Sequence, residues 1–259
     1  MPRLGIDTYK RLVYGACVKT VLSLFDAIGA WSDPYFNAGY DVQTVDLQSL
    51  APLDLREIVD AETALEVFGS PDIILAAPPC TDFSVSGAQY WKAKDADGRT
   101  AASVEIARQV LRIVDLFQPT DDEYIAENGK LLWAVENPVG RMSKLLPEFG
   151  EPWYFDPCDY AGYLNPSPAV LAELDRIRAK NGDGVTSREA DFVMEWNAYT
   201  KKTGLWGNFA RPVKKRIEPV KVCRQGSPLQ RKGGKGDDTK NYRSATPRGF
   251  AIAFFAANR

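Results

Sequence analysis

The sequence contains no histidine, and this absence excludes several kinds of chemistry at once. Without a histidine base, neither serine–histidine nor cysteine–histidine hydrolysis can operate. The four cysteines, Cys17, Cys80, Cys158 and Cys223, lie far apart and show no paired spacing. That spacing argues against a zinc site and against a disulfide framework, so we expect no bound metal.

Long apolar runs are also missing. No stretch approaches roughly 18 consecutive apolar residues, and residues 1–7 do not resemble a signal peptide. We therefore expect a soluble, cytoplasmic protein that has no membrane partner and is a monomer. The 259 residues, 45% hydrophobic and 25% charged, suffice for one sizeable core and a small second lobe.

The net charge of −2 conceals an uneven distribution along the chain. Residues 200–235 hold eleven lysines and arginines against one acid, Glu218, so the remainder of the chain carries a net charge of −12. Two hypotheses stay open for this segment. It is either a solvated surface or a basic lobe for a polyanion such as nucleic acid, because phosphate neutralisation dominates nucleic-acid affinity.

An apolar run over residues 73–77 predicts a buried strand that ends at Pro78 and Pro79. Neither proline can donate a hydrogen bond to a neighbouring strand, and each restricts the residue before it. Cys80 therefore follows the carboxyl end of a central strand, where open α/β sheets bind their ligands. The alternative is an ordinary buried cysteine, since free cysteine is among the most buried residue types.

Two further strands are expected before this one. Residues 19–25 predict a first strand, followed by a turn with Gly29, a helix with Asp33 as its N-cap, and a second strand over residues 40–46. The second strand ends at Asp46. An acid about twenty residues past a glycine turn is an arrangement that binds adenosine, with the acid accepting the ribose hydroxyls. Because only one of the usual glycines is present, a generic strand–helix–strand turn fits the pattern too.

The alternation of helices and strands continues in the middle of the chain. Residues 88–100 are polar and contain glycine, which predicts a mobile loop over the site. Residues 101–117 have a helical period. Another buried strand, residues 131–135, ends in Glu136 and Asn137. Reactive or polar side chains are therefore expected at the carboxyl ends of two central strands.

The order of these residues resembles the DNA (cytosine-5) methyltransferase family. The resemblance rests on Phe25 with Gly29, then Asp46, then Pro78-Pro79-Cys80 with Phe83 and Ser84, and then Glu136 with Asn137. It covers residues 19 to about 145, and residues 244–247 with a helix over residues 248–257 resemble the family's last motif. It implies a Rossmann-like class I methyltransferase fold, three-layer α/β/α with a mixed central sheet, and S-adenosylmethionine as the cofactor.

The resemblance and the chemistry of cytosine together assign catalytic roles. Carbon 5 of cytosine is a poor nucleophile, so a thiolate such as that of Cys80 must first add at carbon 6, its pKa lowered by backbone N–H groups and positive charge. Glu136 would present its proton to N3 of the cytosine if a dry pocket raises the pKa of its carboxyl. The alternative is that Glu136 is a carboxylate that caps nearby backbone N–H groups. By resemblance, Asn137 anchors the loop of Cys80 through hydrogen bonds, and Ser84 and Lys202 complete the catalytic set.

The cofactor side follows from the same resemblance. Phe25 and Gly29 would line the adenosine and methionine, Asp46 the ribose, and Asp54 the adenine amino group. Core packing is the alternative for Phe25. The other residues that the resemblance places at the cofactor are Asp26, Ile28, Ala30, Trp31, Leu47, Leu55, Pro78 and Ser244.

Three regions are expected. Residues 1–164 would form the catalytic and cofactor-binding core, residues 165–240 a reduced basic lobe that recognises DNA, and residues 241–259 a C-terminal helix that returns to the core. In the lobe we expect one helix from Pro168, with Ser167 as its N-cap, and another over residues 187–196. The expected partner is double-stranded DNA, from which the cytosine is flipped into the pocket.

Three other hypotheses stay open. Arg243 lies next to the last cofactor motif, where a basic side chain could pair with a carboxylated sulfonium donor. A catalytically silent relative would bind DNA through the basic segment and leave Cys80 merely buried. RNA also stays open as a substrate, because phosphate-binding residues do not distinguish the two nucleic acids.

Overall fold

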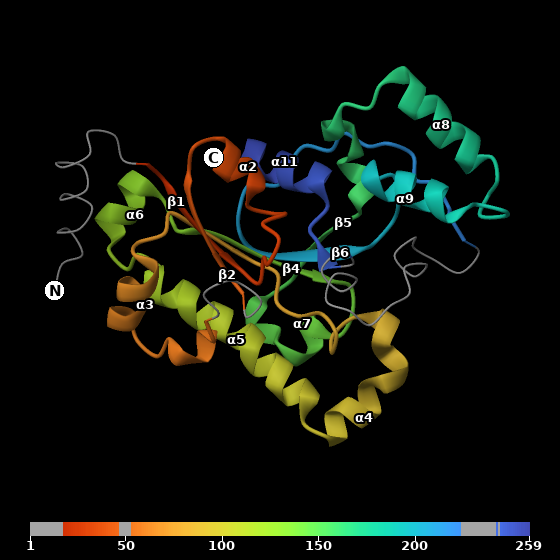
Figure 1. Ribbon diagram of the computed structural model, residues 1–259. Helices are drawn as coiled ribbons and strands as arrows, with labels where there is room; N and C mark the ends of the chain where they lie inside the picture. The colour runs from red at the N-terminus through yellow and green to blue at the C-terminus, as the bar shows by residue number, and fades with distance from the viewer. Residues whose placement is uncertain (1–17, 47–52, 224–241, 243) are drawn as a thin grey trace.

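The computed structural model describes residues 18–46, 53–223, 242 and 244–259. A six-stranded sheet lies at the centre, in the order β2-β1-β3-β4-β6-β5 (Figure 1). Strand β6 is antiparallel to both of its neighbours, β4 and β5, and the other pairs in the sheet are parallel. The strands are β1 (Thr20–Leu24), β2 (Asp41–Val45), β3 (Ile73–Ala76), β4 (Leu132–Pro138), β5 (Trp153–Phe155) and β6 (Thr203–Asn208). The sheet is mixed, as the resemblance implies.

Helices pack against both faces of this sheet (Figure 1). Side chains along a strand point alternately to opposite faces, so Leu22 and Ile74 join one apolar cluster, while Val21 and Leu75 join the other. The first cluster is completed by α3 (Ala61–Phe68) and α5 (Arg99–Phe117), and the second by α2 (Asp33–Asn37) and α11 (Arg248–Ala257). The core therefore lies on both sides of the central strands.

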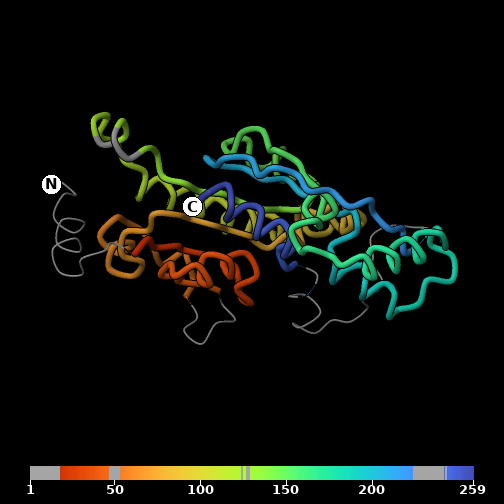
Figure 2. The backbone as a smooth tube through the Cα atoms, turned by 90° about the horizontal axis from the view of Figure 1, so that it is seen from above, coloured from red at the N-terminus to blue at the C-terminus, as the bar shows by residue number. Residues whose placement is uncertain are grey.

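A third apolar cluster lies between α8 (Pro168–Arg178) and α9 (Ser187–Glu195). Both helices project at one end of the molecule, beyond the sheet (Figure 2). Val220 and Val222, from the segment after β6, complete this cluster. As predicted, α8 begins after Ser167, whose hydroxyl accepts a hydrogen bond from the backbone N–H of Val170 at 3.4 Å.

The expected strands over residues 19–25, 40–46, 73–77 and 131–135 are β1 to β4, and the C-terminal helix is α11. The remaining elements are short. They are η1 (Leu55–Glu57), η2 (Val85–Tyr90), α4 (Trp91–Ala96), α6 (Asp122–Asn128), α7 (Met142–Leu145), η3 (Pro147–Phe149), η4 (Pro157–Asp159) and η5 (Ala161–Leu164). In the part of the chain that the structure describes, no helix combines the length and the apolar character needed to cross a membrane.

Two local predictions are wrong. Helix α2 begins at Asp33 itself and Ser32 occupies the cap position, so Asp33 is not the N-cap. The segment expected as a loop over residues 88–100 is largely helical and forms the end of η2, α4 and the start of α5. The sequence pattern does not predict α4, because ion pairs rather than an apolar face attach this helix to the rest of the protein.

Candidate active site

The carboxyl ends of β3 and β4 meet at one edge of the sheet. The two strands are parallel neighbours in which Ala76 pairs with Val135. The loop that follows β3 carries Cys80, and Glu136 and Asn137 come directly after Val135. Cys80 is half-buried and carries a reduced thiol. The structure therefore brings the predicted nucleophile and the predicted acid to the same edge.

Asn137 ties β4 to the loop of Cys80. Its side chain is fully buried, and its Nδ2 donates a hydrogen bond to the carbonyl of Pro78 at 2.9 Å. The hydrogen bond expected from Asn137 to this loop is therefore present. Its Oδ1 is buried and has no hydrogen-bond partner among the described residues, so one acceptor remains available at the site.

Glu136 is a buried carboxyl with one unused oxygen. Its exposed fraction is 3%, Oε2 accepts a hydrogen bond from the Thr246 hydroxyl at 3.4 Å, and Oε1 has no partner in the described ranges. Burial raises the pKa of Glu136, the charge of Lys201 and the Thr246 hydroxyl oppose the rise, and the charge of Asp26 adds to it. The predicted direction of this shift is confirmed. A carboxyl that keeps its proton can donate it to a ligand.

The residues that follow Cys80 form a tight turn, here called the Cys80 turn (residues 80–84). The Cys80 carbonyl accepts hydrogen bonds from the backbone N–H groups of Phe83 at 3.0 Å and Ser84 at 2.9 Å. Ser84 then forms an antiparallel bridge with Gly140, in the loop after β4. A Cβ atom at Gly140 would lie 1.9 Å from the carbonyl oxygen of Phe83, so only glycine fits this contact. The Ser84 hydroxyl lies 3.0 Å from that of Ser86 at the start of η2.

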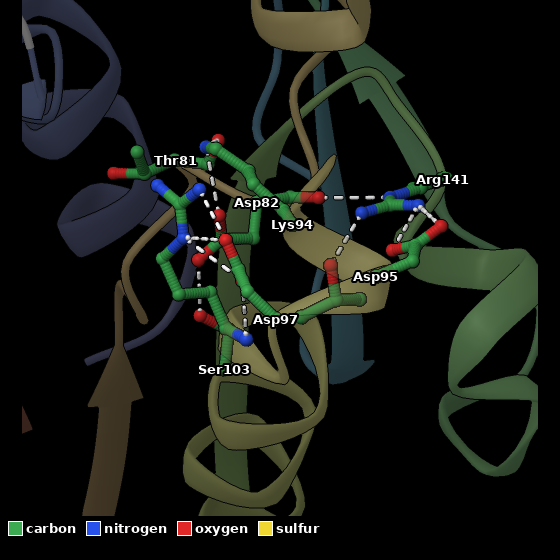
Figure 3. Close-up of polar contacts among 9 residues, drawn as sticks. Thr81, Asp82, Lys94, Asp95, Asp97, Ser103 and Arg141 are labelled. Carbon is green, nitrogen blue, oxygen red and sulfur yellow. Dashed lines mark hydrogen bonds and ion pairs between the residues drawn. The ribbon is translucent and has the colours of Figure 1, made fainter. Parts of the chain in front are cut away.

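A polar cluster surrounds the Cys80 turn (Figure 3). Lys94 of α4 is buried, and its Nζ lies 2.7 Å from the carbonyl of Thr81 and 2.7 Å from the carboxylate of Asp82. Ser103 of α5 donates a second hydrogen bond to that carboxylate at 2.5 Å. Burial by itself would raise the pKa of Asp82, but the hydrogen bonds from Lys94 and Ser103 outweigh it and lower the pKa. Asp82 is therefore a paired carboxylate.

Arg141 joins the same cluster from the loop after β4. Its Nε donates to the Asp82 carbonyl at 2.9 Å, and its two terminal nitrogens bind Asp95 at 2.8 Å and the Thr100 hydroxyl at 2.7 Å. The guanidinium lies over the ring of Trp91, 4.7 Å from its centre. Each nitrogen of the guanidinium thus has a defined partner. Neither Arg141 nor Lys94 is predicted for the site from the sequence, because neither has a periodic signal that would reveal its role.

The ends of β1 and β2 form a second part of the same edge. Leu24 pairs with Val45, and the backbone N–H of Phe25 donates to the Val45 carbonyl at 2.7 Å. The half-buried side chains of Phe25 and Asp46 therefore come from adjacent strand ends. The turn after β1 has positive φ at Gly29 (+68°), as a glycine turn requires.

Asp26 and Asp54 have partners within the protein. Oδ2 of Asp26 accepts hydrogen bonds from the Ser23 hydroxyl at 2.9 Å and from the backbone and hydroxyl of Ser32 at 3.2 and 2.9 Å. These bonds hold the turn after β1 closed. Asp54 caps η1, and hydrogen bonds from Arg56 lower its pKa to about 2. The carboxylate predicted to meet adenine is therefore paired with Arg56.

The other residues predicted for the cofactor are in varied surroundings. Trp31 is 1% exposed, and its ring packs against Phe254 with centroids 5.5 Å apart, so its side chain belongs to the core rather than to an open pocket. Leu55 and Pro78 are also buried. The more accessible ones are Ala30, which is half-buried, and Ile28 and Ser244, which are exposed. Leu47 and Arg243 lie outside the described residues.

Of the two adjacent lysines before β6, Lys201 is the one whose charge lowers the pKa of Glu136. Lys202, predicted as part of the catalytic set, is exposed and its ammonium lies over the ring of Tyr154, 4.7 Å from the centre. Its backbone carbonyl accepts a hydrogen bond from Val139 at 2.9 Å. The backbone of Lys202 therefore stabilises the loop after β4, whereas the positive charge of Lys201 is the one that affects the Glu136 carboxyl.

The described part of the basic segment after β6, residues 209–223, lies against η4 and η5. Buried Asp159 binds Lys214 at 2.9 Å and Arg216 at 2.6 Å, and the Lys215 ammonium lies 4.3 Å from the ring centre of Tyr163. The backbone N–H of Gly162 donates to the Lys215 carbonyl at 2.8 Å. These contacts fix the path of residues 214–216, and the lysines and arginines between residues 209 and 223 are exposed.

Comparison with protein-family models finds no match, and comparison with curated proteins finds none either. Among solved structures, the chain is similar to the methyltransferase EhMeth from Entamoeba histolytica, with 12% identity and a TM-score of 0.36. The match covers 86% of this chain and 62% of that one, so the chain spans less than two thirds of its neighbour's length. A TM-score this low does not establish a common fold, and the function is therefore argued from the residues of the chain itself.

Proposed function

We propose that this protein is an S-adenosylmethionine-dependent DNA (cytosine-5) methyltransferase with a Rossmann-like class I fold. The observation that carries the proposal is Glu136, a buried carboxyl with a raised pKa and one oxygen that has no hydrogen-bond partner among the residues the structure describes. It stands at the end of the strand next to the one that leads to Cys80. A nucleophilic thiol beside a proton-holding acid is the pair that attack on a cytosine ring requires.

In this mechanism the Cys80 thiolate forms a bond to carbon 6 of the flipped base. The electron pair of the ring double bond moves toward carbon 5, and Glu136 meets N3 with its proton so that negative charge does not build up on the ring. When bound, S-adenosylmethionine supplies the methyl group that carbon 5 then takes. A water molecule takes the carbon 5 proton, and the electron pair of that C–H bond re-forms the carbon 5–carbon 6 double bond as the Cys80 thiolate leaves. N3 returns its proton to Glu136, which restores the ring and both protein groups.

The ends of β1 and β2 fit an adenosine. Asp46 offers a half-buried carboxylate to the ribose hydroxyls, and Phe25 offers a half-buried ring beside it. The positive φ of Gly29 supports close backbone approach in the turn that follows. Helices on both faces of the mixed sheet also support the Rossmann-like three-layer fold that the resemblance implies.

The basic segment supports DNA as the substrate. Arg211, Lys215 and Lys221 are exposed on the extended chain after β6, and lysine and arginine contacts to phosphate supply most of the sequence-independent affinity for DNA. The buried carboxylate of Asp159 fixes the path of this chain through its ion pairs with Lys214 and Arg216. A pre-organised cationic strip loses less conformational entropy when it binds than a disordered one does.

Covalent trapping on DNA tests the proposal directly. A duplex oligonucleotide that contains 5-fluorocytosine is incubated with the protein and S-adenosylmethionine, and adducts are separated on a denaturing gel. Because fluorine cannot leave as a proton does, the thiolate stays attached after methyl transfer. We expect a cofactor-dependent adduct that Cys80→Ser abolishes and that Cys223→Ser, a change at another half-buried cysteine, preserves.

Two results would contradict the proposal. An adduct that persists in Cys80→Ser would show that Cys80 is not the nucleophile. No adduct in any sequence context, together with salt-dependent DNA binding, would indicate a silent DNA-binding protein. An RNA oligonucleotide that contains 5-fluorocytosine distinguishes the two nucleic acids. An adduct on RNA alone would show that the substrate is RNA rather than DNA.

A further inference from the structure

The polar cluster around the Cys80 turn has no part in the proposed chemistry, yet it holds the nucleophile's backbone from several sides. On one side, Asn137 binds the carbonyl of Pro78, two residues before Cys80. On the other side, the peptide groups after Cys80 are bound by Arg141 and Lys94. The second set of contacts explains why a buried lysine and a four-partner arginine stand at this point of the fold.

Arg141 acts on the two peptide groups that hold the Cys80 carbonyl. In the first, the N–H of Phe83 binds Cys80 and the carbonyl of Asp82 accepts from the Arg141 Nε at 2.9 Å. In the second, the N–H of Ser84 binds Cys80 and the carbonyl of Phe83 accepts from the Arg141 backbone N–H at 2.9 Å. Because a trans peptide is planar, fixing its carbonyl also fixes the direction of its N–H.

Lys94 fixes a third peptide group of the turn, the one between Thr81 and Asp82. Its Nζ binds the Thr81 carbonyl and the Asp82 carboxylate, both at 2.7 Å, with its side chain only 8% exposed. Burying an ion pair costs desolvation that its attraction often fails to recover, so such a pair is weak evidence for a stabilising role. What this arrangement does provide is a single orientation of the turn.

We propose that Arg141 and Lys94 are positioning residues for the Cys80 thiol, an inference that rests on the proposed function. They act by fixing three of the four peptide groups of the Cys80 turn, so that the thiolate meets carbon 6 at the correct distance and angle. A misplacement of about 1 Å in a reacting group can cost roughly 100-fold in rate.

Arg141→Lys is the discriminating variant. Lysine keeps the charge but cannot bind Asp82, Asp95 and Thr100 together. Cys80 alkylation by iodoacetamide is followed by mass spectrometry across a pH series, and adduct formation on 5-fluorocytosine duplex DNA is timed at saturating DNA. Arg176→Lys, which alters an exposed arginine bound to Glu173 and Glu189, is the matched control.

Two internal readouts separate positioning from unfolding. Cys158 is fully buried and burial raises its pKa to about 11, so its alkylation reports loss of the fold. Thr100→Val removes one acceptor of the Arg141 guanidinium at almost constant volume and serves as a milder second variant. Cys158 should stay protected in both variants.

We expect Arg141→Lys to slow adduct formation about tenfold or more, with unchanged DNA affinity. The rate of Cys80 alkylation should also change, because the turn that carries this half-buried thiol loses the fixed contacts of the guanidinium. Thr100→Val should change both in the same direction by less. Unchanged Cys80 reactivity in both variants, or Cys80 changes that occur only when Cys158 also reacts, would overturn the positioning role.

The failure of this inference is distinguishable from failure of the proposed function. If wild-type protein never forms the DNA adduct but Arg141→Lys still shifts Cys80 alkylation, the positioning role stands and the cytosine chemistry falls. If wild-type protein forms the adduct at a rate that Arg141→Lys and Thr100→Val leave unchanged, the chemistry stands and the positioning role falls.

Discussion

Asp82 lies in the turn after β3, and Glu136 lies near the end of β4, the parallel neighbour of β3. Both carboxyls are buried, yet their surroundings are opposite. Asp82 binds Lys94 and Ser103, and these hydrogen bonds lower its pKa in spite of burial. Glu136 has one long hydrogen bond from Thr246 and one oxygen without a partner in the described chain, and burial raises its pKa.

The difference assigns them different tasks. A carboxylate whose partners are all within the protein stabilises the fold. A carboxyl that keeps its proton in a dry site can donate that proton to a ligand. Two carboxyls whose environments push their pKa values apart can take different roles in one region of a protein. Changing each acid to its amide therefore tests the comparison from both sides.

The largest effect is expected on turnover when Glu136 loses its proton. Glu136→Gln keeps the shape and a hydrogen-bond donor toward N3 but cannot transfer a proton, so kcat for DNA methylation should fall about 10²–10⁴-fold. Glu148→Gln, which alters an exposed carboxylate paired with Arg108, is the control. Turnover within a few-fold of wild type would remove Glu136 from the mechanism.

Asp82 should respond in stability instead. Asp82→Asn leaves the Lys94 ammonium buried beside a neutral group, and we expect the free energy of unfolding in urea to fall by about 3 kcal/mol. Asp95→Asn alters a carboxylate whose side chain is 51% exposed, also paired within the cluster, and should cost far less. Equal losses in the two variants would show that burial of the Asp82 pair does not matter.

The comparison also shows what the sequence could reveal. Strands β3 and β4 are visible in the sequence as apolar runs followed by proline, and their parallel order brings Cys80 and Glu136 to one edge of the sheet. Strand β4 continues through Glu136 and Asn137 to Pro138, beyond its predicted end at residue 135. The raised pKa of Glu136 follows from its position at a buried strand end. These features are local or follow from strand direction, so a pattern in the chain suffices to predict them.

The contacts of Lys94 and Arg141 follow from tertiary structure alone. Arg141 reaches Asp82 across 59 positions of sequence, and α4 looks like a polar loop because its buried residue is a lysine. The resemblance assigns Trp31 and Asp54 to the cofactor. In the structure, however, Trp31 packs against α11 in the core, and Asp54 is paired with Arg56. Local patterns do not say which polar side chains find partners inside the protein.

Removing the charge of Glu136 should also stabilise the fold, by less than the Asp82 change costs. The folded pKa of Glu136 is raised, so as pH rises the unfolded chain releases this proton first and wild-type stability is lost. Glu136→Gln avoids that loss. Its advantage in urea unfolding should be near zero where carboxyls are protonated in both states and grow to about 1 kcal/mol at neutral pH. A pH-independent difference would indicate that the effect comes from packing alone.

The smallest expected effect is a shift in the pH profile caused by Lys201. Its positive charge lowers the pKa of Glu136 against the effect of burial, so Lys201→Met should raise that pKa further. Because the mechanism needs Glu136 protonated, the alkaline limb of kcat/KM should move to higher pH. Lys202→Met is the matched control, since the Lys202 ammonium lies over Tyr154 and is not among the charges that shift Glu136. If both variants move the limb equally, general surface charge rather than Lys201 governs the acid, and if neither moves it, the limb belongs to another group.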